Sequence, residues 1–85
     1  MPKIRKATTW FSTHKTGSLD PSVRVERINE LLGFEGVVGD PDKVEYEWLF
    51  TVDGVPCGIW DYKGTRWSTF GPRHVLAKVF PGQVD

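Results

Sequence analysis

Few residues in this 85-residue chain could do metal, nucleophilic or acid–base chemistry. His14 and His74 lie in different regions, and with Cys57 as the only cysteine they form no ligand spacing that specifies a metal. His74 fits a surface or capping position at the start of a helix. No histidine lies near Cys57 in the sequence to activate its thiol, so a buried, inert cysteine is expected. We expect no catalytic residue and no cofactor.

Carboxylates are the remaining candidates, because general acid–base chemistry needs only a pair of them. Glu45 and Glu47 are expected on the outer face of a strand. Asp61 is expected opposite Tyr46 and beside Arg66, where a cross-strand ion pair accounts for its charge. No glycine-rich phosphate loop or serine-centred elbow is present. The sequence therefore favours a protein that is not an enzyme.

The stretch 44–70 has the pattern of three antiparallel strands. It reads VEYEWLFTV, Asp53-Gly54, VPCGIWDY, Lys63-Gly64 and TRWSTF, and Asp-Gly between apolar runs predicts a type I′ hairpin turn. A second two-residue turn at Lys63-Gly64 puts Trp60 opposite Trp67. A slip of one residue at this second turn would exchange the two faces of the third strand.

Side chains alternate along a strand, so the turns divide this stretch into two faces. The face expected in the core carries Val44, Tyr46, Trp48, Phe50, Val52, Cys57, Ile59 and Phe70. The outer face is expected to present Trp60 and Trp67 as anchors, with Tyr62 and Leu49 beside them and Glu47 at the rim. Apolar patches bordered by charge tend to be interaction sites, and aromatic residues dominate binding energy there. These five residues are the predicted partner-binding surface.

Two helices are expected beside the strands. Asp20 fits an N-cap and Pro21 the first helical position, which predicts a helix over 21–32 that ends at Gly33. Its apolar stripe comprises Val25, Ile28, Leu31 and Leu32. A loop over 35–43 and a second helix after Gly71-Pro72 complete the chain. The fold class is therefore α+β: a two-layer, three-stranded antiparallel meander with an N-terminal and a C-terminal helix on one face.

Eighty-five residues make one domain, an α-β-β-β-α unit over 19–85. Residues 1–18 precede it as a basic arm or as an added strand within residues 7–12. Trp10 and Phe11 offer an alternative to an exposed aromatic face, because they could fold over it and bury it.

The net charge is zero, but residues 1–17 hold the cations Lys3, Arg5, Lys6 and Lys15 and no acid. In its expected order of elements, helix–three strands–helix, the chain resembles double-stranded-RNA-binding domains. Nucleic-acid binding through these four cations and the surface aromatics is therefore the alternative function. The lysine-rich start of that family's last helix is absent, since GPRHVLAKVF holds only Arg73 and Lys78, so such binding would be weak and salt-dependent.

A lone cysteine excludes an internal disulfide, and no apolar run approaches the roughly 20 residues that span a bilayer, so we expect a cytoplasmic protein with no membrane contact. The pattern EWLFTVDGVPCGIWDYKG, followed shortly by a glycine, resembles the middle of small uncharacterised proteins encoded by bacteriophages. This resemblance implies an accessory protein that acts on a host factor, and no site residue carries over from it. The expected function is a non-enzymatic module that docks a protein partner or a second copy of itself.

Overall fold

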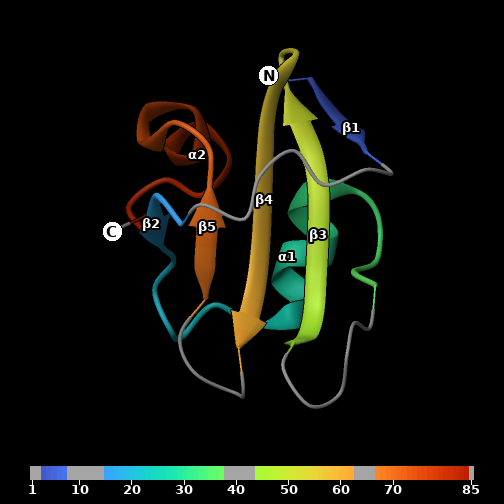
Figure 1. Ribbon diagram of the computed structural model, residues 1–85, viewed down its shortest axis with the longest axis vertical. Helices are drawn as coiled ribbons and strands as arrows, with labels where there is room; N and C mark the ends of the chain where they lie inside the picture. The colour runs from blue at the N-terminus through green and yellow to red at the C-terminus, as the bar shows by residue number, and fades with distance from the viewer. Residues whose placement is uncertain (1–2, 8–14, 38–43, 63–66, 85) are drawn as a thin grey trace.

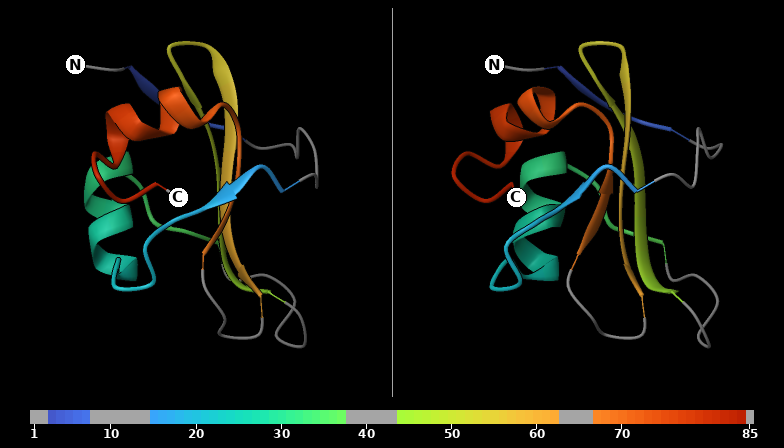
Figure 2. Two further views of the ribbon diagram at one scale, coloured as in Figure 1. Left: turned by 90° about the vertical axis from the view of Figure 1, so that its left-hand side faces the viewer. Right: turned by 60° about the vertical axis from the view of Figure 1, so that its left-hand side comes forward.

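The computed structural model describes residues 3–7, 15–37, 44–62 and 67–84. Its elements, in chain order, are β1 (Ile4–Lys6), β2 (Gly17–Ser18), α1 (Val25–Leu32), β3 (Val44–Val52), β4 (Val55–Tyr62), β5 (Ser68–Phe70) and α2 (Arg73–Val79). The strands form one antiparallel sheet in the order β1-β3-β4-β5-β2 (Figure 1). Both helices cover the same face of it (Figure 2). The α+β class is confirmed, but within the described residues the sheet has five strands instead of three.

The hairpin of β3 and β4 forms as the sequence predicts. Asp53 and Gly54 have φ angles of 51° and 83°, the positive values that a type I′ turn requires. Their turn sets Val52 opposite Val55 and continues in register up to the pair of Glu47 and Trp60.

A β-bulge then interrupts the pairing between Val44 and Glu47, so the predicted pairing of Tyr46 with Asp61 is not kept. Instead, the Tyr46 N–H donates to the Asp61 carboxylate over 2.7 Å. This hydrogen bond satisfies the backbone group that the bulge removes from the ladder.

The predicted register of β5 is wrong by one residue. Phe70 lies opposite Gly58 and Ser68 opposite Trp60, whereas two-residue turns would pair Phe70 with Cys57. Because a strand has a side-chain period of two, this displacement exchanges the faces of β5. Thr69 faces the core and Phe70 faces outward. The predicted Lys63-Gly64 turn, and the proposed partner Arg66, lie outside the described residues.

Helix α1 begins later than the sequence predicts, at Val25 instead of Pro21. The reason is that Asp20 caps a turn and not the helix. Its carboxylate accepts hydrogen bonds from the Ser22 N–H and hydroxyl, and its carbonyl accepts one from the Val23 N–H. Asp and Ser side chains often stabilise such turns in competition with a helix. The predicted end at Gly33, with φ 84°, is confirmed.

The core lies between the helices and the sheet. Trp48, Phe50, Val52, Cys57 and Ile59 are fully buried there, as the alternation of β3 and β4 predicts. Asn29 of α1 ties the layers together, because its side-chain oxygen accepts hydrogen bonds from the Trp48 indole N–H and from the Gly36 N–H. Gly36 leaves room for that indole, since a Cβ on it would lie 2.5 Å from the ring.

The N-terminal segment supplies both edges of the sheet. β1 pairs with β3, and β2 pairs with β5 at the opposite edge. The loop that turns between β3 and β4 also holds β1, because Lys3 and Asp53 exchange two hydrogen bonds of 2.8 and 2.9 Å. β1, at Ile4–Lys6, precedes the segment 7–12 in which an added strand is predicted, and most of that segment, together with Trp10 and Phe11, lies outside the described residues.

Candidate interaction surface

The histidine, cysteine and carboxylate side chains do not come together into a reactive site in the described part of the chain. His74 is exposed in α2, and His14 is not described. Burial raises the pKa of the Cys57 thiol to about 11, which keeps it neutral and unreactive at ordinary pH. No cluster of three His, Cys, Asp or Glu residues that could hold a metal occurs within 3–7, 15–37, 44–62 and 67–84.

Trp67 belongs to the core, so its predicted place beside Trp60 on the outer face is wrong. It is 8 % exposed, and its indole lies edge-on to that of Trp48 at a centroid distance of 5.6 Å. Its N–H donates to the Val23 carbonyl over 2.7 Å. The larger apolar side chain and this hydrogen bond explain why the strand buries Trp67 in preference to Phe70.

Three of the other predicted residues lie on the outer face. Glu47 and Trp60 are direct cross-strand neighbours, and Leu49 lies opposite Gly58. All three side chains are half-buried. Tyr62 ends β4, and its side chain is outside the described part.

Two rows of residues cross this outer face. The first runs through Val37, Glu47, Trp60, Ser68 and Ser18. The second runs through Leu49, Gly58 and Phe70. Gly58 is buried and has no side chain, so no side chain of β4 stands between the two apolar ones of the second row. Trp60 and Phe70 sit diagonally on adjacent strands, within the reach of large side chains.

Val37 is the residue that sequence reasoning missed. It lies in the segment predicted as a solvated loop, but it pairs with Glu47 through two hydrogen bonds of 2.8 and 2.9 Å. It is 52 % exposed and is the one exposed large hydrophobic residue among those described. The signal in the sequence is its β-branched side chain, which favours an extended conformation.

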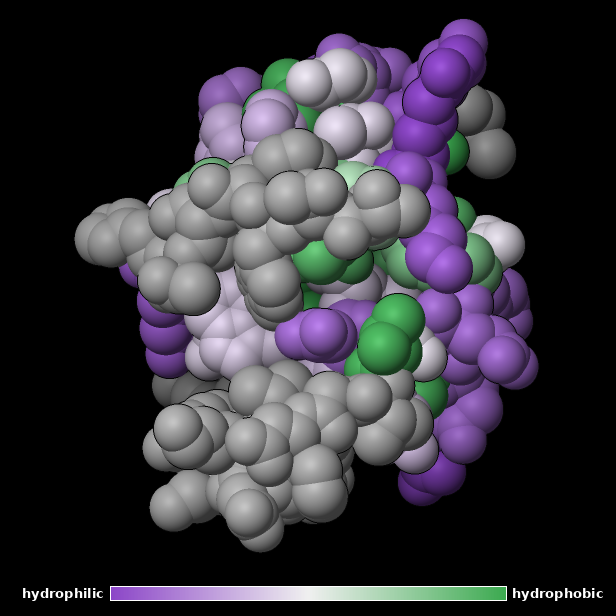
Figure 3. Space-filling view, turned by 45° about the vertical axis from the view of Figure 1, so that its right-hand side comes forward, coloured by the Kyte–Doolittle hydropathy of each residue, from purple (hydrophilic) through white to green (hydrophobic). Residues whose placement is uncertain are grey.

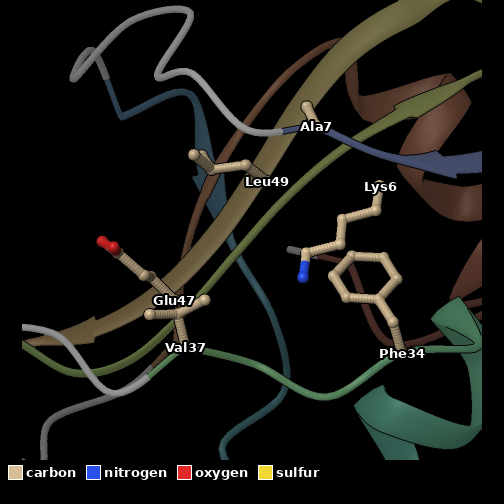
Figure 4. Close-up of a pocket in the computed structure, with 6 residues that line it drawn as sticks. All are labelled: Lys6, Ala7, Phe34, Val37, Glu47 and Leu49. Atoms are coloured by element: carbon tan, nitrogen blue, oxygen red, sulfur yellow. The ribbon is translucent and has the colours of Figure 1, made fainter.

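A pocket of about 280 Å³ opens beside Val37 at the edge of the sheet. Its lining comprises Lys6, Ala7, Phe34, Val37, Glu47 and Leu49 (Figure 4). The pocket lies along the edge of β3, between two segments that pair with this strand. On one side β1 ends its pairing at the hydrogen bond from the Ala7 N–H to the Leu49 carbonyl, and on the other side Val37 pairs with Glu47. In the space-filling view of this side, hydrophobic residues lie among hydrophilic ones (Figure 3).

Charge is distributed asymmetrically around this surface. Lys3, Arg5 and Lys6 are all exposed on or beside β1, at one edge of the sheet. Lys15 is exposed next to β2, at the opposite edge. The four cations predicted to bind nucleic acid are therefore divided between the two edges.

No family model, curated protein or solved structure matches this chain. Neither helix of the described part has the length and apolar composition needed to cross a membrane.

Proposed function

We propose that this protein is a non-enzymatic interaction module that docks a protein partner through the outer face of its sheet. Trp60 is the central anchor, with Leu49 and Phe70 on one side of it and Val37 on the other. Glu47 provides a charge within the patch. Trp67, an anchor in the sequence-based prediction, instead packs in the core against Trp48 and donates a hydrogen bond to the Val23 carbonyl, in the segment before α1.

The observation that carries this proposal is the exposure of Val37 next to Glu47 and Trp60 on the face opposite the helices. An antiparallel sheet usually packs one face on the core and presents polar side chains on the other. Here the second face carries large apolar residues on β3, β4 and β5. Such residues, bordered by charge, are the usual composition of a protein interface.

The class of partner follows from the resemblance to bacteriophage proteins, which implies a host factor in the cytoplasm. A second copy of this chain would fit the same face, because a symmetric dimer uses one self-complementary patch. The division of the basic residues between two edges favours a protein partner over nucleic acid, since a phosphate backbone is bound best by a continuous basic surface.

The test is affinity capture from host extract with four baits: wild-type, Val37→Asp, Trp60→Ala and the control Lys78→Ala. Lys78 is exposed on α2, across the molecule from the patch. Wild-type and control should retain one partner, and the two patch variants should recover it at least about tenfold less well, as expected when an interface anchor is lost. Circular dichroism should show all four folded. Equal recovery by all baits would refute the proposal.

Sedimentation of the same four proteins at increasing concentration tests the homodimer. A dimer that uses this face should dissociate in Val37→Asp and persist in Lys78→Ala. A dimer unaffected by Val37→Asp would assign self-association to another surface.

A further inference from the structure

The pocket beside β3 is small, and its size limits what it can hold. Sites for cofactors and drug-sized ligands have volumes of roughly 300–1,000 Å³, so about 280 Å³ falls just below that range. The space fits one amino-acid residue. Ala7, Phe34, Val37 and Leu49 give it apolar walls, which suit an aliphatic side chain.

One cation lies at the mouth of the pocket. Figure 4 shows the Lys6 ammonium pointing into the space between Phe34 and Val37, while the Glu47 carboxylate points away from it. The ammonium nitrogen lies 5.8 Å from the centre of the Phe34 ring, a cation–π distance. Its orientation against an aromatic wall favours an anionic group of the occupant at this end of the pocket.

The charges that line the pocket are of both signs, because Glu47 lines it as well as Lys6. Of the two, Lys6 points into the space, and the described residues 3–7 around it hold no acid. An occupant is therefore attracted with its negative end toward β1 and its apolar side chain toward Val37 and Leu49. A residue that carries both features in so small a volume is the last residue of a polypeptide, because its carboxylate is bonded to the same Cα as its side chain.

We propose that this pocket binds the C-terminal residue of a partner chain, an aliphatic residue whose free carboxylate pairs with Lys6. The inference rests on the proposed protein-binding function and adds to it the chemistry of the partner's contact. Capture of a terminal carboxylate is an established mode of peptide recognition, and here it is combined with a pocket at a sheet edge.

The test is a nuclear magnetic resonance titration of the isotopically labelled full chain with four small probes. N-acetyl-leucine carries both features, N-acetyl-leucinamide lacks the charge, and N-acetyl-alanine lacks the large side chain. N-acetyl-aspartyl-leucinamide places its carboxylate on a neighbouring residue. Amide shifts of Ala7, Val37 and Leu49 report binding at the pocket.

N-acetyl-leucine should give saturable shifts at these three amides. Removing its charge should weaken the affinity by up to about fivefold, the factor that corresponds to about 1 kcal/mol for an exposed ion pair. Shortening its side chain should also weaken the affinity, because less apolar surface is buried against the walls of the pocket. Lys6→Met keeps the apolar stem and removes the charge, and it should abolish the preference for N-acetyl-leucine over N-acetyl-leucinamide. Lys3→Met, on the same edge but outside the pocket, should leave that preference intact.

Three results would overturn the inference: no saturable shift with N-acetyl-leucine, equal affinity for the charged and uncharged probes, or tighter binding of N-acetyl-aspartyl-leucinamide. The last result would assign the site to an internal acidic residue. None of these results bears on partner capture through Trp60, and a failed capture experiment leaves the titration unaffected, so the two proposals fail separately.

Discussion

Replacing Trp67 by phenylalanine should destabilise this protein strongly, whereas the same replacement at Trp60 should not. The Trp67 indole is buried in the core beside Trp48, and its N–H is bonded to the Val23 carbonyl. A phenyl ring at this position would fill only part of the indole's volume and would leave that carbonyl unpaired. Trp60 lies on the outer face and is only half-buried.

The magnitude follows from these contacts. An unpaired buried carbonyl costs about 1–3 kcal/mol, and the volume lost adds roughly 1 kcal/mol, for a total of about 2–4 kcal/mol. Domains of this size have a free energy of unfolding of roughly 4–13 kcal/mol, so the loss is a large fraction of the whole. For a domain of this length, each kcal/mol shifts Tm by about 4–8 °C, which predicts a fall of roughly 10–30 °C. Trp60→Phe should cost less than about 1 kcal/mol.

The assay is urea unfolding of wild-type and both variants, followed by far-UV circular dichroism because each variant loses a fluorescent indole. The slope of the free energy against urea should be the same in all three proteins, so that the midpoints compare stability directly. Equal midpoints for the two variants, or a larger loss for Trp60→Phe, would show that β5 does not bury Trp67 in the register described above.

Three further predictions concern buried groups. The Thr69 hydroxyl is fully buried with no hydrogen-bond partner among the described residues, so Thr69→Val should raise the free energy of unfolding by about 1 kcal/mol in urea titration; a decrease would show that the hydroxyl is bonded. Asn29→Leu removes the acceptor shared by Trp48 and Gly36 and should cost about 2–3 kcal/mol, while Asn29→Asp, which keeps an acceptor oxygen, should cost less in the same measurement. Burial raises the pKa of the Cys57 thiol from 9.0 to about 11, so between these pH values the unfolded chain releases its proton first and the folded state loses stability as pH rises. Subtracting the pH profile of Cys57→Ala should isolate this loss, and identical profiles for the two proteins would contradict it.

Local rules were sufficient for the β3–β4 hairpin from its turn as far as Glu47 and Trp60, because Asp53-Gly54 fixes the turn and the turn fixes the register up to the bulge. From that register the burial of Trp48, Phe50 and Ile59 follows by alternation alone. The outward position of Trp60, Leu49 and Glu47 follows in the same way. The end of α1 at Gly33 was equally local, because a left-handed residue stops a helix wherever it occurs.

Tertiary packing decided the rest. Whether the chain buries Trp67 or Phe70 depends on distant segments, since the Trp67 indole packs on the Trp48 ring of β3 and donates to the Val23 carbonyl, which precedes α1. The backbone of Val37 finds its hydrogen-bond partner only on β3, at Glu47. The pocket forms because Ala7 and Val37, from two distant segments, both pair with this strand. The sequence by itself determined which side chains alternate within each strand. Which of two alternating faces is buried, and what lines the site, required contacts between distant segments, because burial energy is set by the whole core and not by neighbours in the chain.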